Sequence, residues 1–175
     1  MRNRTVIILL LIGMFNLSNA AALTSFEGKW LTQGSYDVNS LYDGEPLNKT
    51  DEFSGKKLIL KKNKKAIVKL NDYNIRGTWK QKSDKKFVIY LDKNKIEDIA
   101  GDYVNDEYGT ILDYTDVNID VNKNKIIGKM LSDNSIKCRG KIDADADIIF
   151  KEFLIEKKLG TVSFNGKLNF TGVKQ

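Results

Sequence analysis

Closely spaced carboxylates are the side chains of this 175-residue sequence that most readily suggest chemistry. The motif DADAD places Asp143, Asp145 and Asp147 at alternate positions, and Ca²⁺ takes carboxylate oxygens as ligands. An EF-hand loop that starts at Asp143 needs glycine at its sixth position and glutamate at its twelfth, where the sequence has Ile148 and Leu154. A hairpin turn is therefore the favoured interpretation of the motif, with calcium binding as the alternative.

Catalytic chemistry has few candidates in this composition. The chain has no histidine and one cysteine, which excludes Ser–His–Asp and Cys–His catalysis, imidazole-ligated metal sites and thiolate clusters. The cysteine, Cys138, is expected to be a small core side chain. Paired acids such as Asp106 and Glu107 could perform acid–base work only if burial separated their pKa values. We therefore expect a protein that is not an enzyme and needs no metal or cofactor.

The N-terminal residues 1–22 predict a signal peptide. Arg2 and Arg4 precede an apolar run over 5–15, which is too short to cross a bilayer, and small residues follow at cleavage spacing. An uncleaved membrane anchor is the alternative. We expect export to the periplasm or the medium, with residues 23–175 forming a single domain that has no membrane span.

Charge is segregated along the chain. Residues 56–95 hold 14 basic side chains and three aspartates, whereas residues 97–120 hold eight carboxylates and no lysine or arginine. Lysines on the outer face of a sheet block edge pairing and keep the protein soluble, which is the simpler interpretation. The functional alternative is a basic face that meets an anionic envelope polymer or lipid headgroups. Nucleic acid would need the same face, but the predicted export argues against that partner.

Short runs of alternating apolar and polar residues dominate the sequence from residue 53 onward. Strands are predicted over 56–62, 65–72, 74–82, 85–92, 135–143, 147–157 and 161–170, with two more strands about a Lys-Asn turn within 117–131. Helical spacing occurs over 95–104 only, which predicts a short helix or an ordered loop there. Residues 36–52, which include the chain's single proline, predict a long polar loop near the mouth of any cavity.

Many short, half-apolar strands in succession favour an all-β fold. We predict an antiparallel meander closed into a barrel of about eight to ten strands, with at most one short helix. Glycine recurs inside these strands, where tight barrels need bends or close neighbours.

The tripeptide Gly28-Lys29-Trp30, at the start of the first predicted strand, resembles the lipocalins and related calycin barrels. In that family the glycine allows a close approach at the closed end of the barrel, and the tryptophan plugs that end and stacks on an arginine. The stretch that contains "GTW", over 57–92, resembles the hairpin pair of bacterial lipocalin-like domains. The arginine expected near the C-terminus is missing, which leaves Arg76 and Arg139 as the candidates. The tail is weakly similar to that of polyisoprenoid-binding lipocalin-fold proteins.

This resemblance implies a non-catalytic binding protein that holds a small hydrophobic or amphipathic ligand in the barrel. Alternation predicts that inward-facing residues line the cavity, although a one-residue error in register would exchange the two faces. The candidate ligand-binding residues are Ile67, Val88, Tyr90, Ile119 and Phe164. The alternative function is a protein-interaction module, such as an inhibitor or a host-interacting factor, that acts through its charged faces. A hollow interior would favour the first function and a packed interior the second.

Overall fold

The computed structural model describes residues 25–42, 45–71, 73–108, 115–152 and 155–175, so the predicted signal peptide lies outside the described residues. These ranges contain eight strands and one helix: β1 (Gly28–Tyr42), β2 (Glu45–Leu60), β3 (Lys65–Lys69), β4 (Asn74–Ser83), β5 (Lys86–Leu91), α2 (Lys93–Tyr108), β6 (Thr115–Ser132), β7 (Ser135–Glu152) and β8 (Ile155–Lys174). The helix found there is not long and apolar enough to cross a membrane.

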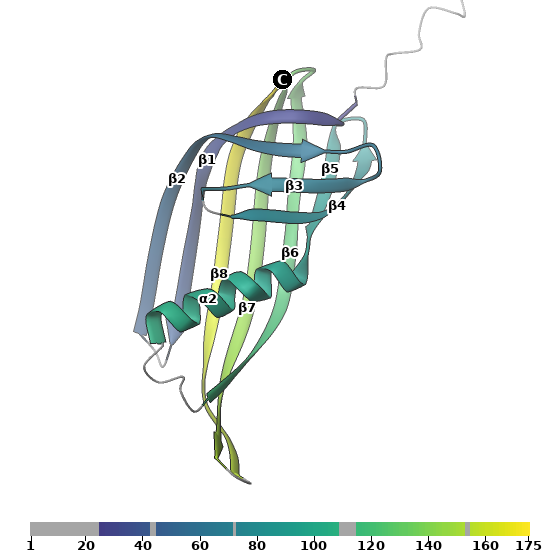
Figure 1. Ribbon diagram of the computed structural model, residues 1–175. Coiled ribbons are helices and arrows are strands. Elements are labelled where there is room, and N and C mark those ends of the chain that lie inside the picture. The colour runs from purple at the N-terminus through teal and green to yellow at the C-terminus, as the bar shows by residue number, and fades with distance from the viewer. Residues whose placement is uncertain (1–24, 43–44, 72, 109–114, 153–154) are drawn as a thin grey trace, which may run out of the picture.

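The strands form one antiparallel meander that closes on itself. Each strand pairs with the next in sequence, and β1 also pairs with β8, from Trp30 opposite Lys174 to Tyr42 opposite Val162 (Figure 1). The predicted all-β antiparallel barrel, its strand number and its single helix are therefore confirmed.

Strand length divides the barrel into two halves. β1, β2, β6, β7 and β8 have 15 to 20 residues, whereas β3, β4 and β5 have 5 to 10. The short strands join the long ones only near one end, through Leu58–Leu60 of β2 and Lys125–Lys129 of β6. Helix α2 spans the opening that the short strands leave beside the long sheet (Figure 1).

The predicted polar loop over 36–52 is wrong, because this segment forms the β1–β2 hairpin. Its pairs run from Gly34 opposite Phe53 to Tyr42 opposite Glu45, and Pro46 lies in β2. Pairing of β2 with β3 covers only Leu58–Leu60, so this part of β2 is an edge, where proline is tolerated. Both faces of the hairpin are rich in polar residues, so the period of two that marks a strand is missing from the sequence.

Two predicted turns in the last third of the chain are also wrong. Residues 117–131 belong to one continuous strand, β6, with a register shift between Val121 and Lys123. The DADAD motif lies within β7, which ends at Glu152, and β8 begins at Ile155, so the predicted strand over 147–157 covers parts of two strands. A bulge inserts one extra residue and breaks the alternation of a strand. Because the residues around the β6 bulge are also polar, their sequence has the pattern of a turn.

Aromatic side chains pack the half of the barrel that the short strands close. Phe26 and Phe87 have ring centroids 4.8 Å apart, and Trp79 meets Phe87 edge-on at 6.5 Å. Cys138 is also fully buried here, as predicted, and burial raises its pKa. This half of the interior is therefore a packed core.

Gly28 and Trp30 lie at the closed end, where the resemblance places them. Gly28 has a φ of +134°, and a Cβ there would lie 3.3 Å from Cε of Lys174, so both conformation and space favour glycine. The Trp30 indole is fully buried and donates its Nε1–H to the carbonyl of Phe26 at 3.0 Å. The cation on this ring is Lys174, with Nζ 5.4 Å from the centroid, and not an arginine.

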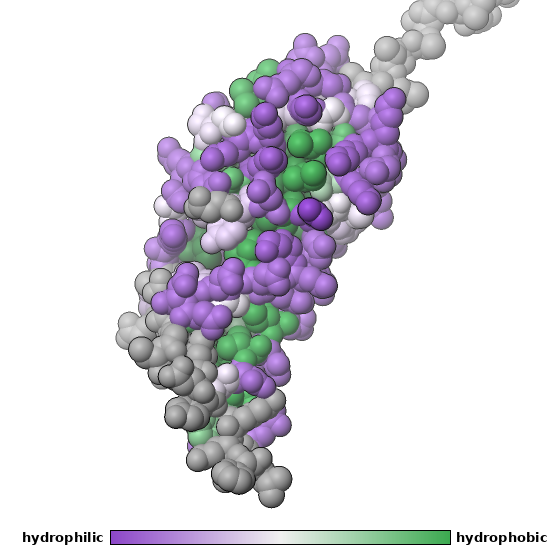
Figure 2. Space-filling view, viewed as in Figure 1, coloured by the Kyte–Doolittle hydropathy of each residue, from purple (hydrophilic) through white to green (hydrophobic). Residues whose placement is uncertain are grey.

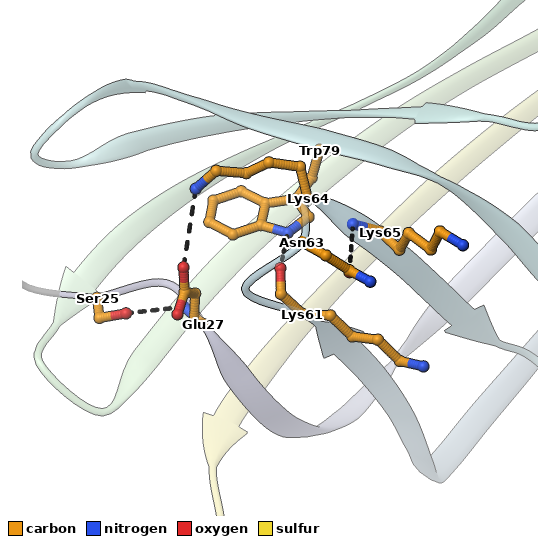
Figure 3. A network of polar contacts seen from close by, with 7 residues as sticks. All are labelled: Ser25, Glu27, Lys61, Asn63, Lys64, Lys65 and Trp79. Carbon is orange, nitrogen blue, oxygen red and sulfur yellow. Dashed lines mark hydrogen bonds and ion pairs between the residues drawn. The ribbon is translucent and has the colours of Figure 1, made fainter.

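A second tryptophan–lysine contact covers the same end of the barrel (Figure 3). Nζ of Lys64 lies 4.4 Å from the ring centroid of Trp79 and 3.7 Å from the carboxylate of Glu27. The Trp79 indole donates to the carbonyl of Lys61 at 2.9 Å. Two capped indoles thus close this end of the barrel interior.

Candidate ligand-binding cavity

Helix α2 is positioned by its apolar side chains against the inner face of the long sheet. Ile96, Ala100 and Val104 recur at a spacing of four, and all three are buried. The Tyr103 ring meets Phe164 of β8 edge-on at 5.4 Å, and its hydroxyl lies 3.2 Å from Oγ of Ser40 in β1. The helical spacing visible in the sequence therefore corresponds to the face that α2 turns toward the sheet, although the helix is longer than predicted.

A cavity of about 170 Å³ lies between α2, β4 and the inner face of β1, β7 and β8. Its apolar wall includes Leu70, Ile75, Ile96, Ala100, Phe164 and Leu168. Figure 2 shows apolar side chains on this side of the molecule, between the short strands and the polar outer face of α2. The cavity is thus the hollow part of an otherwise packed interior.

Polar groups are few and lie around this apolar wall. Tyr36 donates its hydroxyl to Oδ2 of Asp51 at 2.8 Å, and Tyr103 contacts the buried Ser40. Lys49 also lines the cavity and is exposed, so it marks the solvent end. An apolar body with a few placed polar groups is the usual composition of a small-molecule site.

The size of the cavity limits what it can hold in this conformation. Ligand pockets usually measure about 300 to 1,000 Å³, whereas an apolar cavity of about 150 Å³ is enough for benzene. The observed volume of about 170 Å³ fits one ring or a short alkyl chain. A larger ligand would require α2 to move away from the sheet.

Two of the five predicted ligand residues face the interior. Phe164 lines the cavity directly. Ile119 packs against the core beneath α2, where a Cβ on Gly101 would lie 3.5 Å from its Cδ1, but it is not part of the cavity wall.

The other three predicted ligand residues lie on the outer face of the barrel. Ile67, Val88 and Tyr90 are half-buried, and their strand neighbours, such as Phe87 and Ile89, occupy the core instead. β3 and β5 have apolar residues on both faces, so alternation does not decide which set points inward. The cavity residues absent from the prediction lie on α2, in the β1–β2 hairpin, around the start of β4, and on β7 and β8. The helical spacing of Ile96 and Ala100 is the signal in the sequence that could have found the α2 wall.

The three aspartates of the DADAD motif lie on the outer face of β7 and bond to neighbouring side chains. Oδ2 of Asp143 contacts Nζ of Lys123 at 2.8 Å and Nζ of Lys141 at 3.3 Å. Burial raises the pKa of Asp143, but the hydrogen bonds and charges of the two lysines outweigh it and hold this pKa below its usual value.

The other two aspartates of the motif have partners of their own. Asp147 accepts from Lys158 at 2.7 Å and from Thr161 at 2.8 Å, and these hydrogen bonds lower its pKa. Asp145 accepts from Asn122 and Ser163. Within the described residues, no group of three or more histidine, cysteine or acidic side chains is arranged to hold a metal ion. The motif is therefore a polar ladder that joins three strands.

The acidic pair considered for acid–base chemistry is only partly within the described residues. Asp106 is exposed near the C-terminal end of α2, and the side chain of Glu107 lies outside the described residues. Asp106 thus lacks the burial that this chemistry would require.

Comparisons with known proteins give no family assignment. No protein-family model matches the chain, and no curated protein matches it. Among solved structures, the chain is similar to a multidomain protein including DUF1735 from Bacteroides ovatus, with 8% sequence identity and a TM-score of 0.29. The similarity covers 84% of this chain and 49% of that one.

Proposed function

We propose that the protein is an exported, non-catalytic binding protein that holds a small hydrophobic or amphipathic ligand between α2 and the long sheet. The observation that carries this proposal is the apolar cavity of about 170 Å³ beneath the helix. A carrier needs a hollow interior, whereas a protein-interaction module does not. The cavity therefore supports the carrier over the interaction module.

Two further features support the same function. The buried Trp30 indole at the closed end supports a lipocalin-like barrel, with Lys174 in the place where the resemblance implies an arginine. The apolar leader with its small residues supports delivery to the periplasm or the medium.

The side chains around the cavity favour an amphipathic ligand with an anionic head. Lys49 lies at the solvent end, where an ammonium group could contact a carboxylate without being desolvated. The apolar wall below it suits a short alkyl chain or a ring.

Isothermal titration with octanoate tests the proposal on the full chain. Wild-type protein should bind, and Ala100→Leu should weaken binding by about tenfold or more, because the larger side chain fills the cavity. Asp102→Leu is the matched control, since it adds the same side chain at an exposed position of the same helix outside the cavity wall, and it should bind like the wild type. Equal binding by Ala100→Leu and wild type would show that the ligand occupies another place.

A further inference from the structure

Positively charged side chains that are far apart in the sequence lie together on the outer face of β5, β6 and β7. We call it the basic face, and it consists of Lys86, Lys125, Lys129, Lys137, Arg139 and Lys141, all exposed. Five of its members lie outside the basic segment 56–95 and reach this face only through strand pairing. The lysines follow one another across strands, with Lys86 opposite Lys129 and Lys129 opposite Lys137.

This arrangement places like charges directly opposite each other, which destabilises a sheet. Lys125 lies opposite Lys141, and Lys141 in turn lies opposite Lys167 of β8. Within the part of the chain that the structure describes, the one member of the basic face with a carboxylate partner is Lys141, which contacts Asp143. The charge of the other members is thus unneutralised.

Edge protection does not explain the basic face. Lysines keep sheet edges from pairing with other chains. β6 and β7, however, carry these lysines where each strand already has a neighbour on both sides. A local departure from the rules of stability without a structural purpose is expected at a functional surface.

The centre of the basic face is apolar. Ile127, at the middle of β6, is 56% exposed and lies opposite Val88 of β5. Tyr90 lies beside them, with its ring 5.1 Å from Nζ of Lys80 and 5.6 Å from Nζ of Lys125. Leu131, further along β6, is 59% exposed. Aliphatic side chains and tyrosine among lysines suit a bilayer surface, where the lysines contact phosphates and the apolar groups enter the headgroup boundary.

We propose that the basic face binds the surface of a membrane that carries anionic phosphate headgroups. The three aspartates of β7 continue the same outer face beyond Lys141, and two of them pair with lysines there, so the excess positive charge is confined to one half of these strands. Contact is therefore limited to the half of the barrel that the two tryptophans close. The cavity lies toward the other half and stays accessible. This proposal does not depend on the proposed ligand.

Vesicle co-sedimentation of the full chain tests the proposal. Vesicles of phosphatidylcholine with phosphatidylglycerol are compared with phosphatidylcholine alone, which reports any contribution of the N-terminal apolar run. The triple variant Lys125→Gln/Lys129→Gln/Lys137→Gln should lose roughly a hundredfold in affinity for anionic vesicles. It should fold as well as the wild type or better, because it relieves like-charge repulsion.

The matched control removes the same charge elsewhere. Lys57→Gln/Lys62→Gln/Lys69→Gln changes three exposed lysines on β2, β3 and the turn between them, and it should bind nearly as well as the wild type. Equal losses in both triple variants would mean that net charge alone drives binding and would overturn the proposal. No loss in the first triple variant would do the same.

A second variant distinguishes a bilayer from a soluble polyanion. Ile127→Ser should weaken binding to anionic vesicles by about tenfold, because it removes the central apolar group, and should leave binding of inorganic polyphosphate unchanged. Two results together would overturn the membrane proposal: Ile127→Ser binds vesicles like the wild type, and the triple variant loses about a hundredfold in affinity for polyphosphate. The partner would then be a soluble polyanion.

Discussion

Gly34 sets the distance between two strands at the point where the barrel closes. It lies in β1 opposite Phe170 of β8, and a Cβ there would overlap the backbone of Asn169 and Phe170. Because those atoms are main chain, they cannot move aside as a flexible side chain could. A register shift between Thr32 and Gly34 adds to the local bend.

We expect Gly34→Ala to lower the free energy of unfolding by about 3 kcal/mol, because β1 and β8 would have to separate. Gly101→Ala is the matched control. Its Cβ would meet Ile119 at an ordinary 3.5 Å, and alanine favours the helix, so it should raise stability by about 0.5 to 1 kcal/mol. Urea denaturation measures both. If both substitutions changed the free energy of unfolding equally, the close approach of β1 and β8 at Gly34 would be contradicted.

Asp143 links stability to pH. Its pKa lies below the usual 3.8, so the folded chain binds a proton less readily than the unfolded chain does. Its contribution is present above about pH 4 and is lost as the pH falls through the folded pKa. Asp143→Asn should therefore cost about 1 to 2 kcal/mol at pH 7 and less at pH 3. Asp102→Asn, at an exposed position on α2, should change stability little at either pH. A cost for Asp143→Asn that does not vary with pH would contradict this linkage.

At the scale of elements, α2 is the part that makes the cavity, since the other walls are barrel strands. Tyr103 holds the second half of α2 against the sheet by two contacts. Its ring packs against Phe164, and its hydroxyl lies near Ser40. Contacts of this kind decide how readily a helix opens locally while the rest of the fold stays intact.

Tyr103→Ala should speed amide hydrogen exchange in α2 and leave exchange in β6 and β7 near the closed end unchanged. Tyr103→Phe keeps the ring contact and loses only the hydroxyl, so its effect should be clearly smaller. Exchange followed by mass spectrometry measures both variants. Faster exchange over the whole barrel in Tyr103→Ala would mean that α2 does not open as a separate unit.

The elements that could be predicted from the sequence are those with one apolar face. β4, β8 and α2 each have such a face, and the sequence pattern predicts each of them in the right place. β3 and β5 are apolar on both faces, which is why Ile67, Val88 and Tyr90 were assigned to the wrong side. One face of the β1–β2 hairpin lines the solvent end of the cavity and the other face is in water. Its sequence therefore lacks the alternation of apolar and polar residues that marks a strand.

At the scale of the whole molecule, the barrel has a packed half and a hollow half. Strand length produces this division, because β3, β4 and β5 are too short to close the opening that α2 covers. The sequence shows segregated charge along the chain, but only pairing of β5, β6 and β7 brings the lysines onto one face. Strand register determines both the cavity and the basic face, and alternation alone does not fix it.

Native mass spectrometry of the protein purified from its own host without detergent tests the central claim most directly. The native mass should exceed the denatured mass by one small-molecule adduct, and Ala100→Leu, which fills the cavity, should lack that adduct. Fragmentation of the released adduct would identify the ligand class. A wild-type native mass equal to that of the polypeptide, or an adduct that Ala100→Leu retains in full, would contradict a ligand held beneath α2.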